Sequence, residues 1–123
     1  MKRDLDLARR ILQAVESSEA DPRGWIDLDF VDEYPKNVVA YHVVLLADDG
    51  LIEAQDLMTL GDDGYVWMPK RLTAAGHDFL DAARQEDDWA KGKRLLEQAG
   101  AASFTLLKEL LLHLGRQRLG LPD

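Results

Sequence analysis

The chain has 123 residues, of which 46% are hydrophobic and 31% charged, a composition typical of one globular domain with its own core. It contains no cysteine, which excludes disulfides, thiolate metal sites and cysteine nucleophiles and suits a reducing cytoplasm. The net charge of −8 disfavours nucleic-acid binding, because most non-specific affinity for nucleic acid comes from basic side chains that displace counterions.

The charge is distributed unevenly along the chain. Residues 1–55 sum to −6, residues 56–90 to −5 and residues 91–123 to +3. The basic residues of the last part are either the solvated side of helices or an anion-facing patch, and they are Lys91, Lys93, Arg94, Lys108, Arg116 and Arg118.

Neither a secretory signal nor a membrane span is predicted. Met1-Lys2-Arg3-Asp4 leads directly into amphipathic sequence, without the apolar stretch and cleavage site of a signal. The longest apolar run, Leu110-Leu111-Leu112 with its neighbours, is far shorter than the roughly 20 residues that a membrane span requires. We therefore expect a soluble, cytoplasmic protein with no membrane partner.

The first predicted helix begins after Asp4, a good N-cap residue, and ends near Glu16. Arg9, Arg10 and Gln13 are expected outside, and the apolar positions at helical spacing are Leu5, Ala8, Ile11, Leu12 and Val15. Residues 17–24 read as a loop. Residues 25–30 alternate apolar with acidic, which fits either a short strand or the start of a short second helix.

A second helix is predicted from Pro35, which is tolerated in a first turn, to Gly50, which is expected to end it as a left-handed cap. Its inner stripe is Val39, Val43 and Leu46, with His42 beside them. Residues 51–54 should then enter a strand. Residues 61–64 have strong turn chemistry and residues 65–68 favour a strand, so this part predicts a β-hairpin.

Thr73 is expected to follow the second strand and to cap another helix, whose inward positions are Gly76, Phe79, Leu80 and Ala83. Glycine in a helix interior costs up to about 1 kcal/mol relative to alanine, so Gly76 predicts the close approach of another backbone. A further helix beginning in residues 85–88 contains Trp89, Leu95 and Leu96 and ends near Gly100, and Ser103 caps a last one.

This order predicts an α+β fold, a winged helix-turn-helix with a small β-hairpin wing and a helical C-terminal extension. The winged-helix domain is assigned to residues 1–84. Residues 85–123 form the extension, which serves dimerisation or packing.

The helix from Pro35 to Leu46 occupies the place of a recognition helix, whose outer face lies in the major groove of DNA. Its outward residues would be Lys36, Asn37, Ala40, Tyr41 and Val44. Lys36 is the one permanent cation there, and acidic residues flank it.

The wing gives a second test of DNA binding, because wings that touch DNA normally carry Arg or Lys at their tips. Here the tip is Asp62-Asp63, which repels DNA unless Lys70 or Arg71 reaches round it.

Metal binding and catalysis are not indicated. His42 and His77 are expected nearest the core, each making one buried hydrogen bond, and without cysteine or a helical His-x-x-x-His pair we predict neither a metal nor a cofactor. Asp78 and Asp81 beside His77 could be read as an acid–base group, but successive helix positions point in different directions. We therefore expect no enzyme.

The last helix carries more leucine than one small core usually absorbs. It folds back on its own core, pairs with a second copy or binds a partner's groove, and we expect a homodimer through Leu106, Leu107, Leu110, Leu111 and Leu114.

Several short segments between Met1 and about Lys93 together resemble the sequences of one protein family. They are Met1-Lys2-Arg3-Asp4-Leu5, Arg9-Arg10-Ile11-Leu12, Tyr41-His42, Gly50-Leu51-Ile52, and Leu72-Thr73-Ala74-Ala75-Gly76-His77-Asp78-Phe79-Leu80-Asp81-Ala82-Ala83-Arg84 with Trp89 and Lys93. The chain resembles the domain-of-unknown-function family 2513 of small bacterial and phage-borne proteins. The resemblance implies a winged-helix fold and a mobile-element setting, and it supplies no catalytic residues.

We therefore expect a non-enzymatic winged-helix binding module. The first hypothesis is a small bacterial or phage transcriptional regulator that dimerises through residues 103–119 and binds double-stranded DNA. The alternative is an acidic adaptor or inhibitor that binds a basic protein partner or imitates nucleic-acid phosphate.

Overall fold

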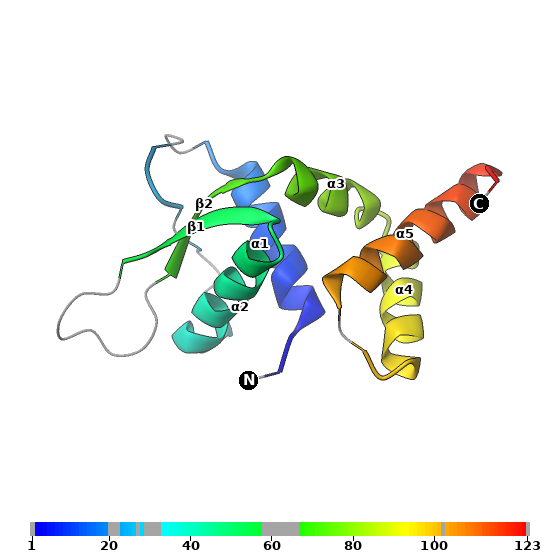
Figure 1. The fold of residues 1–123 in the computed structure, drawn as a ribbon, viewed down its shortest axis with the longest axis horizontal. Coiled ribbons are helices and arrows are strands. Elements are labelled where there is room, and N and C mark those ends of the chain that lie inside the picture. The colour runs from blue at the N-terminus through cyan, green and yellow to red at the C-terminus, as the bar shows by residue number, and fades with distance from the viewer. Residues whose placement is uncertain are drawn as a thin grey trace. The chain divides into compact units, whose positions relative to one another are not determined.

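The computed structural model of the chain describes residues 2–19, 23–26, 28, 33–57, 67–101 and 103–122. Within these residues the protein is α+β, with five helices and one antiparallel pair of strands (Figure 1). The elements, in chain order, are α1 (Leu5–Ser17), α2 (Lys36–Asp48), β1 (Ile52–Asp56), β2 (Trp67–Leu72), α3 (Ala74–Ala82), α4 (Glu86–Gln98) and α5 (Phe104–Leu119).

The chain divides into two compact units, residues 1–77 and residues 78–123. The boundary between the two units falls within α3.

Helix α1 begins where its cap predicts. The Asp4 carboxylate accepts a hydrogen bond from the Leu7 amide at 3.1 Å, which satisfies one of the amides that a helix start leaves without a partner. The buried face is wider than predicted, because it also includes Leu7 and Arg9. Arg9, expected outside, is only 8% exposed, since both α2 and β2 contact this helix.

Helix α2 follows Pro35, which is the N-cap rather than a residue of the first turn. The Pro35 carbonyl accepts from the Val38 and Val39 amides at 3.0 and 3.2 Å, so the rigid ring begins the helix without losing a hydrogen bond. Gly50 has φ +74°, the left-handed conformation predicted for the end of this helix.

Strands β1 and β2 form the hairpin that the turn chemistry predicts. Ile52 pairs with Leu72 at one end and Asp56 with Trp67 at the other. The register shifts between Glu53, which faces Arg71, and Ala54, which faces Pro69. Lys70 is therefore an extra residue on β2, as in a β-bulge. Residues 61–66, which contain the predicted wing tip, lie outside the described residues.

The segment predicted at residues 25–30 forms neither a strand nor a helix at Trp25, Ile26 or Leu28, and its other positions lie outside the described residues. Ile26 is buried, and its amide donates to the Pro69 carbonyl on β2 at 2.9 Å. One main-chain hydrogen bond thus attaches this segment to the hairpin.

The turn from β2 into α3 contains the close backbone contact that Gly76 predicted. The Thr73 hydroxyl accepts from the Gly76 amide at 3.0 Å and donates to the Gly50 carbonyl at 2.5 Å. A Cβ atom placed on Gly76 would lie 1.9 Å from the Leu51 carbonyl oxygen. Only glycine therefore lets the start of α3 approach the chain entering β1.

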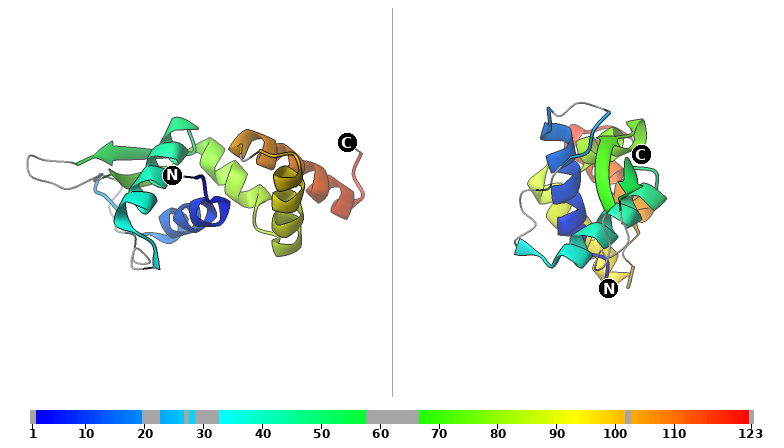
Figure 2. Two further views of the ribbon diagram at one scale, coloured as in Figure 1. Left: turned by 90° about the horizontal axis from the view of Figure 1, so that it is seen from below. Right: turned by 90° about the vertical axis from the view of Figure 1, so that its left-hand side faces the viewer.

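The core of residues 1–77 lies where α1, α2 and the hairpin contact one another (Figure 2). Strand β2 contacts both helices, and α1 also contacts α2. The fully buried residues at this meeting point include Leu7, Ile11, Leu12, Val43 and Leu46.

In residues 78–123, α4 and α5 contact each other and bury one face each. Gly92 allows the close approach, because a Cβ atom there would lie 3.2 Å from Leu111 Cδ2 and 3.3 Å from Leu107 Cδ1. Phe79 and Phe104 meet edge to face, with ring centroids 5.9 Å apart. Ser103 caps α5 through the Leu106 amide at 3.3 Å, as predicted.

Candidate functional site

The outer face of α2 is the first candidate surface, because it holds the residues predicted to face DNA. Lys36 and Asn37 are exposed and Tyr41 is half-buried. Ala40, predicted to point outward, is only 6% exposed, so that prediction is wrong. The reason is that α1, β1 and β2 all contact α2, which buries a wider arc of the helix than the stripe of Val39, Val43 and Leu46.

Beyond Tyr41 the same face is apolar and then acidic. Val44 and Leu45 are half-buried, and Asp48 is exposed at the end of the helix. No lysine or arginine follows Lys36 in α2. A surface of this composition offers little to the phosphates that flank the major groove, because phosphate contacts depend on cationic and hydrogen-bond-donating groups.

The hairpin provides the other residues predicted for DNA, Lys70 and Arg71. The register places Arg71 opposite Glu53, and its guanidinium donates two hydrogen bonds to that carboxylate, at 2.7 and 2.9 Å. The hydrogen bond lowers the pKa of Glu53 below its ordinary value of 4.5. Glu53 thus balances the charge of Arg71 within the hairpin. Lys70 is half-buried. Asp62 and Asp63 lie outside the described residues.

A second arginine is engaged in the same way. Arg10 on α1 donates to Glu33 from both terminal nitrogens, at 2.5 and 3.3 Å, and its guanidinium carbon lies 5.9 Å from the centre of the Tyr34 ring. The hydrogen bond lowers the pKa of Glu33 and raises that of Arg10. Both arginine–carboxylate pairs are exposed, so each matches charge more than it adds stability.

His42 is fully buried, as predicted, and has a structural role. Its Nε2 accepts from the Asp4 amide at 2.7 Å, and its Nδ1 lies 2.7 Å from the Val38 carbonyl oxygen. Because a carbonyl can only accept, the ring proton belongs on Nδ1. The ring makes two hydrogen bonds rather than the one predicted, and it joins α2 to the start of α1.

His77 is exposed, so the prediction that it lies near the core is wrong. It follows Gly76, whose backbone faces Leu51, and the next position of a helix points in another direction. His77 lines an open pocket of 360 Å³ together with Val15, Glu16, Ser18, Ile26, Lys70, Arg71 and Leu72.

The described residues contain no group of three or more His, Asp or Glu side chains placed to hold a metal ion. Asp81, considered with Asp78 and His77 as an acid–base group, instead forms an ion pair with Arg84 at 3.0 Å.

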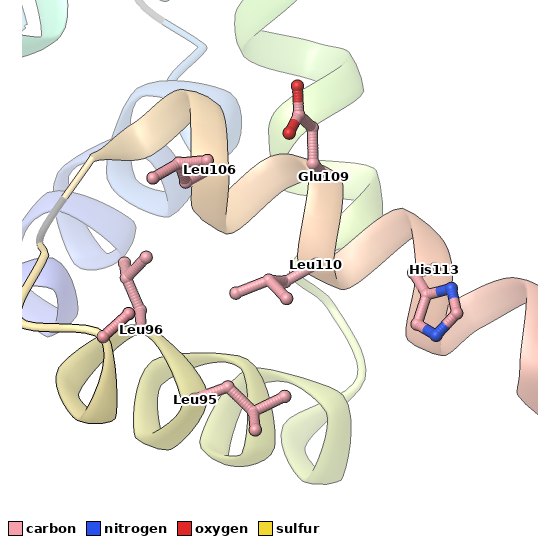
Figure 3. Close-up of a pocket in the computed structure, with 7 residues that line it drawn as sticks. Leu95, Leu96, Leu106, Glu109, Leu110 and His113 are labelled. Atoms are coloured by element: carbon pink, nitrogen blue, oxygen red, sulfur yellow. The ribbon is translucent and has the colours of Figure 1, made fainter.

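The leucines predicted for a dimer interface separate into two sets. Leu107, Leu111 and Leu114 are buried within the chain. Leu106 is 45% exposed and Leu110 is half-buried. These two lie on a groove of 310 Å³ between α4 and α5 (Figure 3), which is lined by Leu95, Leu96, Ala99, Leu106, Glu109, Leu110 and His113.

The basic residues of this unit have varied surroundings. Arg118 pairs with Asp88 at 3.1 Å, and the Lys93 ammonium lies 5.9 Å from the centre of the Trp89 ring. Lys91, Arg94 and Arg116 are exposed.

Sequence reasoning missed two kinds of residue. Glu33 and Glu53 were not predicted as the ion-pair partners of Arg10 and Arg71, although the register of a hairpin could have indicated Glu53. Leu95 and His113 were not assigned to a surface, because the crossing of α4 and α5 decides which flank of each helix stays open.

The sequence matches the family described as hypothetical protein DUF2513 over residues 2–102. An uncharacterized protein of Haemophilus influenzae strain Rd is 37% identical over 89 residues, which cover 72% of this chain and 73% of that protein. No solved structure matches the chain. Among the helices described, none has both the length and the apolar character needed to cross a bilayer.

Proposed function

This chain belongs to the DUF2513 family, whose description names no activity, and from that premise we propose that it is a non-catalytic winged-helix module that binds a basic protein partner. The observation that carries the proposal is the outer face of α2. At the position where a DNA-binding member of the fold presents cations, this face presents Tyr41, Val44, Leu45 and Asp48.

The winged-helix assignment rests on element order and on one hydrogen bond. Among the described residues, two helices precede an antiparallel hairpin, and a third helix follows it after a threonine cap. The Ile26 amide bonds to Pro69 on β2, at the place where a third strand would join such a hairpin.

Charge favours a basic protein over DNA as the partner. Residues 1–77 sum to −7, and Arg10 and Arg71 are matched by carboxylates. A negative potential raises the encounter rate with a basic protein and lowers it with a polyanion. The half-buried apolar side chains of α2 add a surface that water solvates poorly.

Double-stranded DNA is the second candidate, because Lys36 and Asn37 are exposed at the first turn of α2 and no side chain caps that turn. In a regulator these residues would contact phosphate or base edges.

Capture experiments with matched variants separate the two candidates. The immobilised protein should retain a basic protein from a nuclease-treated lysate, and Asp48→Lys or Tyr41→Ala should reduce the retention at least about tenfold, roughly the loss of one well-buried contact. Asp78→Lys, which changes the net charge equally at an exposed position of α3, is the control and should retain the partner.

A DNA-binding measurement gives the result that would contradict the protein-binding proposal. The chain would be a DNA-binding regulator instead if it bound a labelled random duplex at low ionic strength, and if Lys36→Ala abolished this binding while Asp48→Lys kept it.

A further inference from the structure

The open pocket beside β2 has a mixed polar and apolar lining that the proposed function does not use. Its volume of 360 Å³ lies within the range of small-molecule sites. The lining comes from the end of α1, from Ile26, from β2 and from the start of α3, all within residues 1–77. No described residue of α2 lines the pocket, so it is distinct from the surface proposed to bind a protein.

Two basic side chains of this lining make no hydrogen bond or ion pair in the described part of the chain. They are Lys70, which is half-buried, and His77, which is exposed. Arg71 also lines the pocket, but its guanidinium is already engaged, because Nε and Nη2 donate to Glu53 and Nη1 donates to the Leu72 carbonyl. The groups that remain able to donate to a ligand are therefore the Lys70 ammonium and the His77 ring.

The β-bulge explains how consecutive residues of β2 come to line one pocket. In a regular strand, successive side chains point to opposite faces, so Lys70 and Arg71 would face away from each other. Lys70 is the extra residue of the bulge, since Arg71 pairs with Glu53 and Pro69 pairs with Ala54. Bulges re-aim a side chain in this way and are frequent beside functional sites.

The rest of the lining limits which anion fits. Val15, Ile26 and Leu72 are buried and apolar, so an apolar part of a ligand would be removed from water against them. Glu16 is half-buried and brings a carboxylate to the same pocket. This carboxylate repels a phosphate dianion more strongly than a singly charged carboxylate, because the Coulomb energy grows with the charge.

We propose that this pocket binds a small monocarboxylate with an apolar body. The Lys70 ammonium and an N–H of the His77 ring donate to the ligand's carboxylate, and both side chains carry such a donor at neutral pH. The apolar body packs against the buried aliphatic residues of the lining. This inference does not depend on the function proposed for α2.

The test is a titration of the full chain with hexanoate, followed by the backbone amide signals in NMR spectra. Hexanoate should shift the amides of Lys70, Leu72 and His77 in a saturable manner. Hexanamide, which has the same carbon chain without the charge, should bind at least about tenfold more weakly, because hydrogen bonds to a charged group are the stronger ones. Inorganic phosphate should also bind more weakly than hexanoate, and Glu16→Gln should reduce that difference.

Matched variants test the two donors. Lys70→Met keeps an unbranched apolar side chain and removes the charge, so it should weaken hexanoate binding at least about tenfold. Lys36→Met is the control, because it changes the net charge equally at an exposed position outside the pocket, and it should bind hexanoate normally. His77→Gln, which keeps an N–H donor, should bind hexanoate more tightly than His77→Phe.

Four results would each overturn the proposal. They are the absence of any shift at the pocket amides, hexanamide binding as tight as that of hexanoate, an equal loss in Lys36→Met and Lys70→Met, and phosphate binding at least as tight as that of hexanoate. The amide signals of α4 and α5, which should stay unchanged in every variant, verify that the chain remains folded.

Discussion

The two units of this protein differ in the kind of contact through which their helices and strands pack. In the described part of residues 1–77, two helices and a hairpin pack against one another through specific contacts: a carbonyl against a glycine, a histidine between two backbones, and arginines paired with carboxylates. In residues 78–123 two helices pack through leucine side chains and leave other leucines in water. The fold of the first unit therefore depends on backbone contacts that tolerate little change. The fold of the second depends on side-chain packing that can adjust.

The difference between the two units is tested most strongly by replacing one glycine with alanine in each unit. Gly76→Ala places a methyl group 1.9 Å from the Leu51 carbonyl oxygen. Because the methyl carbon is bonded directly to the main chain of α3 and the oxygen belongs to the main chain before β1, the clash cannot be relieved without displacing α3 or β1. We expect a loss of about 3 kcal/mol or more in the free energy of unfolding, measured by urea denaturation.

Gly92→Ala is the matched change in the second unit. The new methyl group meets only the ends of Leu107 and Leu111, and alanine favours the helix by up to about 1 kcal/mol. The stability should therefore stay within about 1 kcal/mol of the wild type. Equal losses in the two variants would remove the distinction between the units.

A smaller effect is expected from the buried histidine. His42→Phe keeps a flat ring but leaves the Asp4 amide without its acceptor, which should cost about 1–3 kcal/mol. His77→Phe, at an exposed position, should change stability by no more than about 0.5 kcal/mol. A tolerated His42→Phe would mean that packing alone joins α2 to the start of α1.

The smallest effect should be a change in pH dependence. The Glu53 pKa is lowered in the folded protein by Arg71, so this pair stabilises the fold above the ordinary value of 4.5 and the contribution disappears as the pH falls through the lowered pKa. Glu53→Gln should reduce the loss of stability below pH 4.5, measured by denaturation at a series of pH values.

Arg71→Met is the control for this pH dependence, because it removes the same pair from the other side. It should flatten the profile equally, and the double variant should show no further change. An unaltered slope in both single variants would show that the pair does not contribute.

The sequence predicted local structure well, because helix starts and ends depend on the chemistry of individual capping residues. Asp4, Thr73 and Ser103 cap helices with their own side chains, and Gly50 adopts the left-handed conformation at a helix end. Even the contact at Gly76 was predictable, since glycine in a helix interior needs a steric reason. Membership of the DUF2513 family, predicted from several segments between Met1 and about Lys93, is confirmed over residues 2–102.

Predictions that depended on the width of a buried face were less accurate. Ala40 and Arg9 are buried because their helices are contacted by more than one neighbour, and helical periodicity cannot reveal how many neighbours a helix has. The leucines of α5 were recognised as too many for one core, but the crossing with α4 decides that Leu107 is buried and Leu106 is exposed.

The contact between Gly76 and Leu51 also has an evolutionary consequence. A residue other than glycine cannot be accommodated at position 76 while α3 begins where it does, so descendants of this chain can change the position only after the neighbouring backbone has moved. Relatives should therefore keep glycine here even where their surfaces have diverged completely. A relative with a side chain at this position would identify a lineage in which the geometry after the hairpin had been rebuilt.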